Sequence, residues 1–236
     1  MDLEKDLSAP KGEHGGRHPL PKVEDLANTL RRAGVGSDSR VIAYDDQGGA
    51  MASRLWWLLK YLGHDSVYVM DEGFSAWKAA DFPVSAEQKI VVPGNFAARP
   101  RPEMLADMEE VKSKLSALGV VLVDSREGPR YRGEVETIDR TAGHIPGARN
   151  RFWAEGRRSD GSWKSAEEQG VRFADLFKDD EVIVYCGSGV TACPNVLALQ
   201  EAGFTRVKLY AGSWSDWISY EDNSVAVGDK EDSKGV

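Results

Sequence analysis

Short apolar runs alternate with helical stretches along this chain, and the same order occurs twice. Residues 182–185 form an apolar, β-branched run that predicts a buried parallel strand, and the helical stretch 195–202 that follows it stops at Gly203. Residues 41–44 begin the same order in the first half, where Gly63 corresponds to Gly203. Each half is therefore expected to contain strand, loop, helix, strand and short helix, an order that predicts a parallel sheet flanked by helices.

The two halves of the chain are not equally complete. The second half opens with a predicted helix over residues 103–118 and a strand over residues 120–124, and nothing before Met1 matches them in the first half. The shortfall is about 40–45 residues. We therefore expect the first half to lack its first strand and helix and to leave strand edges unpaired, so that a chain extended upstream is more stable. A start inside a longer gene, a deliberate fragment and a shortened lineage that oligomerises are all compatible with this pattern.

The composition of the chain predicts two domains, a linker and a tail. Residues 1–84 are expected to form the incomplete first domain and residues 103–221 the second. Between them, residues 85–102 contain three prolines and one glycine without sustained periodicity, which indicates a linker. Residues 222–236 are polar and charged and are expected to be disordered.

The charge balance of the 236-residue chain narrows the choice of partners. With 38 acidic against 30 basic residues, the net charge is −8, which disfavours nucleic acid and anionic membranes. No apolar run approaches the length of a membrane span, and two cysteines cannot form a disulfide framework, so we expect a cytoplasmic protein. The four histidines lack metal-ligand spacing, and no metal site is predicted.

The residue at which the chain is expected to perform chemistry is Cys186. It directly follows the strand 182–185, and the short loop Gly187-Ser188-Gly189 separates it from a helical stretch. Such a unit directs backbone N–H groups and the positive end of a helix at the sulfur, which stabilises the thiolate, the nucleophilic form. Packing alone would not explain a loop of small residues here, so a reactive cysteine is the preferred interpretation.

Two neighbouring residues restrict the possible chemistry of this loop. A phosphate-binding loop would have the same shape, but cysteine-dependent phosphatases carry an arginine where this chain has Ala192. Without that arginine, a phosphoryl transition state lacks its main charge partner. Cys193 lies seven residues after Cys186 and is expected about two turns along the helix, facing the core. A role for Cys193 as a resolving thiol or disulfide partner stays open.

Several motifs of the chain together resemble the two-domain rhodanese family, and within it the 3-mercaptopyruvate sulfurtransferase branch. The matching segments are residues 16–21, 124–126, 130–133, 143–148, 186–193 and 212–214, with Trp217. They span almost the whole chain in family order. The resemblance implies an α/β protein with tandem rhodanese-like domains, each a parallel sheet flanked by helices, of which the first is incomplete.

The resemblance also implies a role for individual residues. Cys186 would be the nucleophile, Ser188 a relay hydroxyl beside it, and Glu4 the acid of the triad, where the family has aspartate. Arg130 matches the arginine that holds the substrate carboxylate. The residues expected to bind substrate are Arg17, Arg126, Arg130, Arg132, Gly187, Gly189, Val190 and Thr191. The alternatives are structural ion pairs for the arginines, a turn residue for Ser188 and a solvated acid for Glu4.

The first half is expected to contribute to binding and not to carry sulfur. Asp45 stands where the second half has Cys186, and aspartate cannot form a persulfide. This matches the family, in which usually only the C-terminal domain is active. Arg17 and His18 lie in a Gly-Gly-Arg-His-Pro turn, which would line the cleft between the domains or lie at the surface.

The neutral residues after the cysteine favour one sulfur donor. Gly187 and Ser188 resemble the mercaptopyruvate branch, whereas thiosulfate-preferring rhodaneses tend to be cationic there, which suits a dianion. The implied reaction moves sulfane sulfur from 3-mercaptopyruvate through a Cys186 persulfide to thioredoxin, a small thiol or cyanide, without a cofactor or metal. The alternatives are a thiosulfate:cyanide sulfurtransferase and a non-catalytic rhodanese-like binding module.

Overall fold

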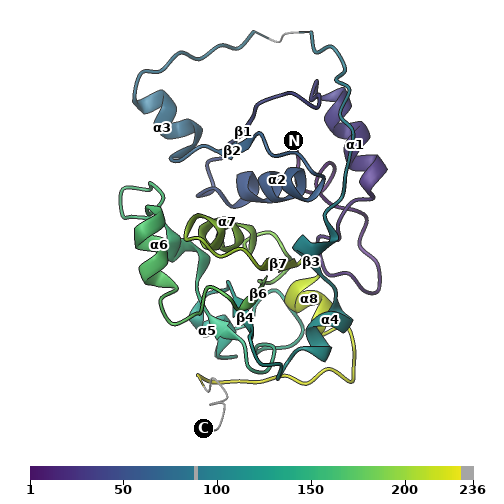
Figure 1. Cartoon of the computed structure of the whole chain (residues 1–236), viewed down its shortest axis with the longest axis vertical. Coiled ribbons are helices and arrows are strands. Elements are labelled where there is room, and N and C mark those ends of the chain that lie inside the picture. The colour runs from purple at the N-terminus through teal and green to yellow at the C-terminus, as the bar shows by residue number, and fades with distance from the viewer. Residues whose placement is uncertain (88–89, 230–236) are drawn as a thin grey trace.

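The computed structural model describes residues 1–87 and 90–229. It has two α/β halves stacked along the long axis, with the N-terminal half at the top of Figure 1. The first half contains α1 (Val23–Arg32), β1 (Val41–Ala43), α2 (Ala50–Tyr61), β2 (Val67–Val69) and α3 (Gly73–Ala79). The second half contains η1 (Pro102–Met104), β3 (Leu105–Ala106), α4 (Met108–Ser113), β4 (Val120–Asp124), α5 (Gly128–Tyr131), β5 (Arg149–Asn150), η2 (Trp153–Gly156), α6 (Ala166–Arg172), β6 (Glu181–Tyr185), α7 (Cys193–Glu201), β7 (Val207–Tyr210) and α8 (Ser213–Trp217).

A five-stranded parallel sheet with the order β3-β7-β6-β4-β5 forms the centre of the second half. Its middle strand β6 is buried at all five positions, because helices cover both faces. Val182 and Val184 face the layer that contains α7, whereas Ile183 and Tyr185 face the layer that contains Trp214. The predicted α/β architecture, a parallel sheet flanked by helices, is confirmed.

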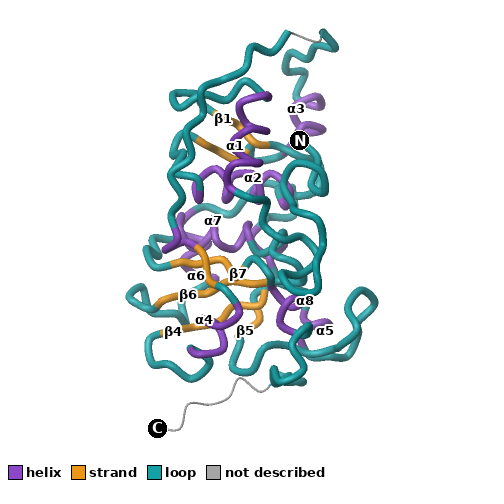
Figure 2. The backbone as a smooth tube through the Cα atoms, turned by 90° about the vertical axis from the view of Figure 1, so that its right-hand side faces the viewer, coloured by secondary structure: helices purple, strands orange, loops and turns teal. Residues whose placement is uncertain are grey.

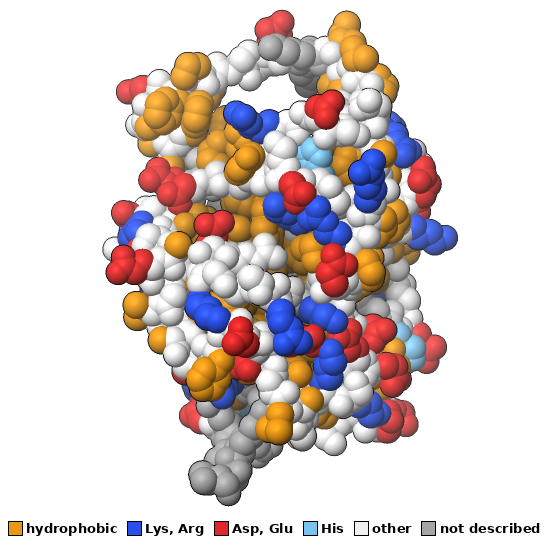
Figure 3. All heavy atoms as spheres, viewed as in Figure 1, with side chains coloured by type: hydrophobic (Ala, Val, Ile, Leu, Met, Phe, Trp, Pro, Cys, Tyr) orange, Lys and Arg blue, Asp and Glu red, His pale blue; other side chains and the backbone are white. Residues whose placement is uncertain are grey.

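The first half contains a smaller sheet. Its strands β1 and β2 are parallel, and within the described residues they pair only with each other. Ile42 and Tyr68 on these strands are 55 % and 54 % exposed. Figure 3 shows further hydrophobic side chains at the surface around α3 and along the boundary between the halves. The expected unpaired strand edges and exposed apolar surface are therefore present in this structure.

The two halves share one hydrophobic core, in which α2 packs against α7 (Figure 2). Trp57 and Leu59 of α2 belong to the same buried cluster as Val196 and Leu199 of α7, and none of the four side chains is exposed. Because α7 follows the Cys186 loop directly, this packing places the first half against the back of that loop.

The structure differs from the sequence-based expectation at the start of the second half. The single helix expected over residues 103–118 is instead η1, β3 and the short helix α4. Leu105 and Ala106 pair with the edge of β7, and Asp107 caps α4 by accepting the backbone N–H of Glu110 at 2.8 Å. Strand pairing and a side-chain cap thus outweigh local helix propensity here.

The expected linker and tail are more ordered than their composition suggests. In the linker, Phe96 is 2 % exposed, and the N–H of Arg99 donates to the carbonyl of Leu62 at 2.8 Å. In the tail, Ala226 forms an antiparallel bridge with His144 through hydrogen bonds of 2.8 and 3.0 Å. Disorder from residue 222 onward is therefore wrong for the segment 222–229, because sheet-like backbone bonds hold it; residues 230–236 lie outside the described residues.

We expect Leu199→Ala to lower the free energy of unfolding by about 2–5 kcal/mol, because it leaves a cavity in the shared core. Both halves should still unfold in one transition, because side chains of α2 and α7 belong to the same hydrophobic core. Urea unfolding followed by circular dichroism and by tryptophan fluorescence measures both effects. Leu118→Ala is the matched control, because Leu118 is 89 % exposed. Two separate transitions, with only one shifted, would contradict a shared core.

Candidate active site

Cys186 lies at the carboxyl end of β6, in the loop that leads to α7. Its side chain is 1 % exposed, and its Sγ accepts a hydrogen bond from the N–H of Gly189 at 3.2 Å. Gly189 has a φ of +77°, and a Cβ at this position would lie 2.1 Å from the carbonyl oxygen of Ala211. Only glycine therefore permits the turn that points this N–H at the sulfur.

Other N–H groups of the same loop face no acceptor. Within the described part of the chain, the backbone N–H groups of Gly187, Ser188, Val190 and Thr191 have no hydrogen-bond acceptor in the chain itself. Backbone N–H groups that converge in a loop of this kind form a binding site for a small anion. The loop can thus accommodate negative charge next to Cys186.

The corresponding loop of the first half already holds an anion. The carboxylate of Asp45 accepts the backbone N–H groups of Gln47, Gly49 and Ala52, each at 2.8 Å. Asp45 is the residue that sequence comparison of the halves places opposite Cys186. Loops at equivalent places in the two halves therefore differ in what they hold: one binds a carboxylate, and the other surrounds a sulfur.

Cys193 is a different kind of thiol from Cys186. It is the first residue of α7, so the expectation that it lies about two turns along the helix is wrong, because the loop after Cys186 extends to Ala192 before the helix begins; the expectation that it faces the core is confirmed. It is fully buried, and its Sγ donates to the carbonyl of Gly189 at 3.4 Å. Burial raises the pKa of Cys193 to about 12, and Cys193 therefore stays a protonated thiol near neutral pH.

A hydrogen-bonded relay connects the two halves at the active loop. His18 Nδ1 lies 2.8 Å from Ser188 Oγ, and His18 Nε2 lies 2.9 Å from Glu4 Oε1. Since the ionised carboxylate only accepts, a neutral ring donates from Nε2 and accepts the Ser188 hydroxyl at Nδ1. The sequence predicted catalytic roles for Ser188 and Glu4, but for His18 it predicted only a position in the cleft. The turn of small residues and prolines around His18 could have indicated its role.

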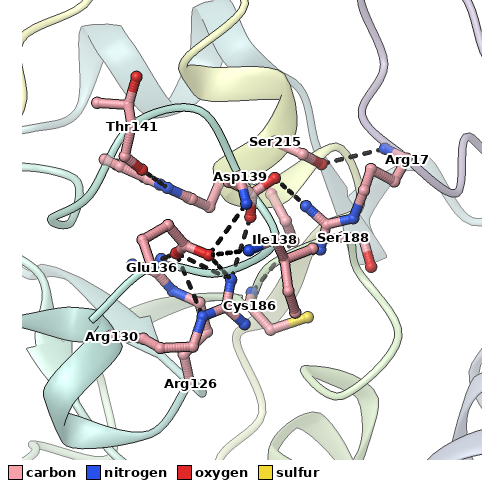
Figure 4. Close-up of polar contacts among 12 residues, drawn as sticks. Arg17, Arg126, Arg130, Glu136, Ile138, Asp139, Thr141, Cys186, Ser188 and Ser215 are labelled. Atoms are coloured by element: carbon pink, nitrogen blue, oxygen red, sulfur yellow. Dashed lines mark hydrogen bonds and ion pairs between the residues drawn. The ribbon is translucent and has the colours of Figure 1, made fainter. Parts of the chain in front are cut away.

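Two arginines and two acids form the wall above Cys186 (Figure 4). Asp139 lies between the guanidinium groups of Arg17, with which it pairs, and Arg130, at 3.1 Å. Arg130 also binds Glu136 at 2.8 Å. Burial raises the pKa of Glu136, but the N–H groups of Asp139 and Ile138 and the charge of Arg130 lower it more, so this carboxylate stays ionised. Both arginines are thus paired with acids of the chain itself.

Both guanidinium groups border the first residue of the active loop. A Cβ on Gly187 would lie 2.8 Å from Arg17 and 3.7 Å from Arg130. Arg17 also lines two hollows of about 410 and about 590 Å³, one next to Asp139 and the other next to Glu4 and His18. Arg17 thus lies at the border of both hollows, and Cys186 lines neither of them.

The two other arginines expected at the site differ from each other: Arg126 borders the wall, with Nη1 3.6 Å from Glu136 Oε2 (Figure 4), whereas Arg132 lies apart from it. Arg126 is 3 % exposed, donates to Asp124 at 2.6 Å and stacks over Trp214 at 4.8 Å. Arg132 pairs with Glu134 at 2.8 Å near the surface. An acid two positions away in sequence pairs with each guanidinium, and Arg126 contacts Glu136 of the wall in addition.

The described residues contain no group of three or more His, Cys, Asp or Glu side chains that could hold a metal ion. None of the helices in that part of the chain is long and apolar enough to cross a membrane.

Comparison with known proteins gives a consistent family. Residues 12–80 and 107–220 match the rhodanese-like domain. The chain is 47 % identical over 234 residues to the "Probable 3-mercaptopyruvate sulfurtransferase" of Pseudomonas aeruginosa, covering 97 % of this chain and 82 % of that protein. It is 35 % identical over 210 residues to the 3-mercaptopyruvate sulfurtransferase of Homo sapiens, covering 85 % and 69 %. The family resemblance found in the sequence motifs is confirmed.

A solved structure shares the whole arrangement. The anaerobic ergothioneine biosynthesis enzyme of Chlorobium limicola, in complex with trimethyl histidine, superposes with a TM-score of 0.84 at 26 % sequence identity. The match covers 97 % of this chain and 59 % of that enzyme, so the chain spans about three fifths of its length.

Iodoacetamide near neutral pH is expected to modify Cys186 and to leave Cys193 unmodified, because a pKa of about 12 leaves almost no Cys193 thiolate. Timed labelling with peptide mass mapping measures this. Cys193→Ser should label like the wild type and keep most turnover, whereas Cys186→Ser should abolish turnover. Equal labelling of both thiols in the folded protein would instead support a dithiol mechanism.

Proposed function

The chain belongs to the rhodanese-like family of sulfurtransferases, and from this premise we propose that it transfers sulfane sulfur from 3-mercaptopyruvate to a thiol through a persulfide on Cys186. Two relatives carry the name of this donor. The observation that carries the proposal is the loop of unoccupied N–H groups around Cys186, whose counterpart in the first half binds the Asp45 carboxylate. A persulfide anion on Cys186 would occupy the same kind of site.

The arginine pair supports a donor with a carboxylate. Arg17 and Arg130 already hold the carboxylate of Asp139 between them, next to Gly187. The carboxylate of 3-mercaptopyruvate would take the place of Asp139, which directs the donor's sulfur toward Cys186. Paired guanidinium groups suit a planar carboxylate well.

The first half-reaction then proceeds at the sulfur of the donor. The Cys186 thiolate attacks this sulfur, the S–S bond forms, and the carbon–sulfur bond breaks with its electron pair leaving on pyruvate as the enolate. The proton of the donor thiol moves through Ser188 and His18, which Glu4 orients, and is delivered to the enolate carbon. The products are pyruvate and a Cys186 persulfide anion, which the loop N–H groups stabilise.

The second half-reaction returns the enzyme to its starting state. An acceptor thiolate or cyanide attacks the outer sulfur, the S–S bond breaks, and Cys186 leaves as the thiolate. Thioredoxin and small thiols are acceptors of the right chemistry, and they and the two free cysteines suit the cytoplasm. The chemistry requires neither an organic cofactor nor a metal ion.

Incubation with 3-mercaptopyruvate is expected to add the mass of one sulfur atom to the intact protein, and Cys186→Ser should prevent it. A thiol acceptor should then remove the added mass, because the persulfide is an intermediate. Intact-protein mass spectrometry and kcat/KM for both donors provide the measurement. A higher kcat/KM for thiosulfate would assign the other sulfurtransferase activity. A folded protein that takes sulfur from neither donor would be a binding module.

Asp139→Asn is expected to lower the KM for 3-mercaptopyruvate about threefold to tenfold, because the substrate carboxylate no longer competes with an internal one. Initial rates over a range of donor concentrations measure the change. Glu134→Gln is the matched control, since Glu134 lies nearby in sequence but pairs with Arg132 near the surface. An increased KM in Asp139→Asn would mean that Asp139 holds the arginines in place and is not displaced by substrate.

A further inference from the structure

One charged side chain of the first half is buried directly behind the active loop. Arg54 lies within α2 and is 0 % exposed. It is among the largest fully buried side chains of the protein and lies beside the core residues Trp57 and Leu58 of the same helix. A buried guanidinium is costly unless it is hydrogen-bonded: both Nη atoms of Arg54 have partners, whereas its Nε has none, so the partners of the Nη atoms indicate what the side chain does.

The partners of Arg54 are backbone carbonyl groups from three separate segments. It donates to Gly189 at 3.1 Å, to His18 at 3.2 Å and to Leu7 at 3.4 Å. Gly189 belongs to the Cys186 loop, His18 to the relay, and Leu7 to the N-terminal segment that carries Glu4. One side chain thus connects the three segments that must meet for sulfur transfer.

The contact with Gly189 bears on the sulfur itself. The carbonyl of Gly189 accepts from Arg54 and from Cys193 Sγ, while the N–H of the same residue points at Cys186 Sγ at 3.2 Å. Two donors on the carbonyl side fix the orientation of this residue's backbone in the loop. The N–H is therefore held toward Cys186 before any substrate arrives.

The charge of Arg54 has no carboxylate partner within 4.0 Å among the described residues. Burial lowers the pKa of Arg54, and negative charge on Cys193 or Cys186 would raise it. Cys193 stays protonated, because burial raises its pKa to about 12. In the proposed reaction, the persulfide anion on Cys186 would balance this buried cation.

We propose that Arg54 is a positioning residue for sulfur transfer: it orients the Gly189 backbone and the His18 segment and provides a fixed positive charge behind the Cys186 sulfur. This inference rests on the proposed function for its kinetic consequence, but not for its electrostatic one. A planar guanidinium can hold several carbonyl groups at once, which a lysine ammonium at the same place cannot do with the same geometry. The half of the chain that carries no sulfur thereby supplies charge to the half that does.

Arg54→Met and Arg54→Lys separate the charge from the geometry. The first measurement is the ratio of Cys186 alkylation rates with iodoacetate and iodoacetamide, which depends on nearby positive charge and needs no sulfur donor. Arg54→Met should lower this ratio about threefold or more, and Arg54→Lys should keep it near the wild-type value. Arg31→Met is the matched control, because Arg31 also donates to a backbone carbonyl, that of Phe96, in the same half.

The second measurement is steady-state kinetics with 3-mercaptopyruvate. Both Arg54 variants should lower kcat, Arg54→Met at least about tenfold, with KM changed less than about threefold, since Arg54 lies behind the sulfur and not at the carboxylate site. An unchanged alkylation ratio in a folded Arg54→Met would overturn the electrostatic role. If Arg54→Met does not fold, Arg54→Lys decides: a retained ratio with lowered kcat supports the proposal, and wild-type kcat overturns it. A lowered ratio in a protein that forms no persulfide would refute the proposed function and leave the role of Arg54 intact.

Discussion

The packing of α2 against α7 is the constraint on which the site depends. It buries Trp57, Leu59 and Leu199 in one core, and it fixes the distance between a helix of the first half and the loop of the second. Arg54 lies on the same helix as this apolar surface, so its reach to Gly189 follows from the packing. A shift of α2 by one turn, about 5.4 Å, would remove that contact. The site is therefore a property of both halves, even though one half alone carries the nucleophile.

The chain uses one loop design for two different anions. In the first half three backbone N–H groups donate to the carboxylate of Asp45, which satisfies them. In the second half they surround Cys186, a sulfur whose charge changes when it receives and releases an atom. The first loop is consequently a completed structural turn, whereas the second keeps unused donors for an intermediate.

Local patterns in the sequence predicted the central strand, the parallel sheet and the loop after Cys186, because each depends on neighbouring residues. Contacts between residues far apart in the sequence could not be predicted from local patterns. His18 bonds to Ser188 across 170 residues, and Arg54 bonds to Gly189 across 135. The partners of the arginines could not be predicted either, since Arg126 pairs with Asp124 nearby in sequence and also contacts Glu136 of the wall. The helix expected over residues 103–118 was wrong because pairing of β3 with β7, a tertiary interaction, overrides propensity.

Asp139 lies between Arg17 and Arg130, and in the proposed reaction donor binding is therefore an exchange of one carboxylate for another. Acidic side chains neutralise both arginines before the donor binds. The site therefore attracts distant anions only weakly, and the net charge of the chain, −8, weakens this attraction further. Selectivity among ligands then depends on how well the carboxylate of each ligand competes with Asp139 for the two arginines. Inorganic anions and simple carboxylates that lack a sulfur within reach of Cys186 gain little from such an exchange. The cysteine is thereby shielded from the many small acids of a cell without a lid that must open and close.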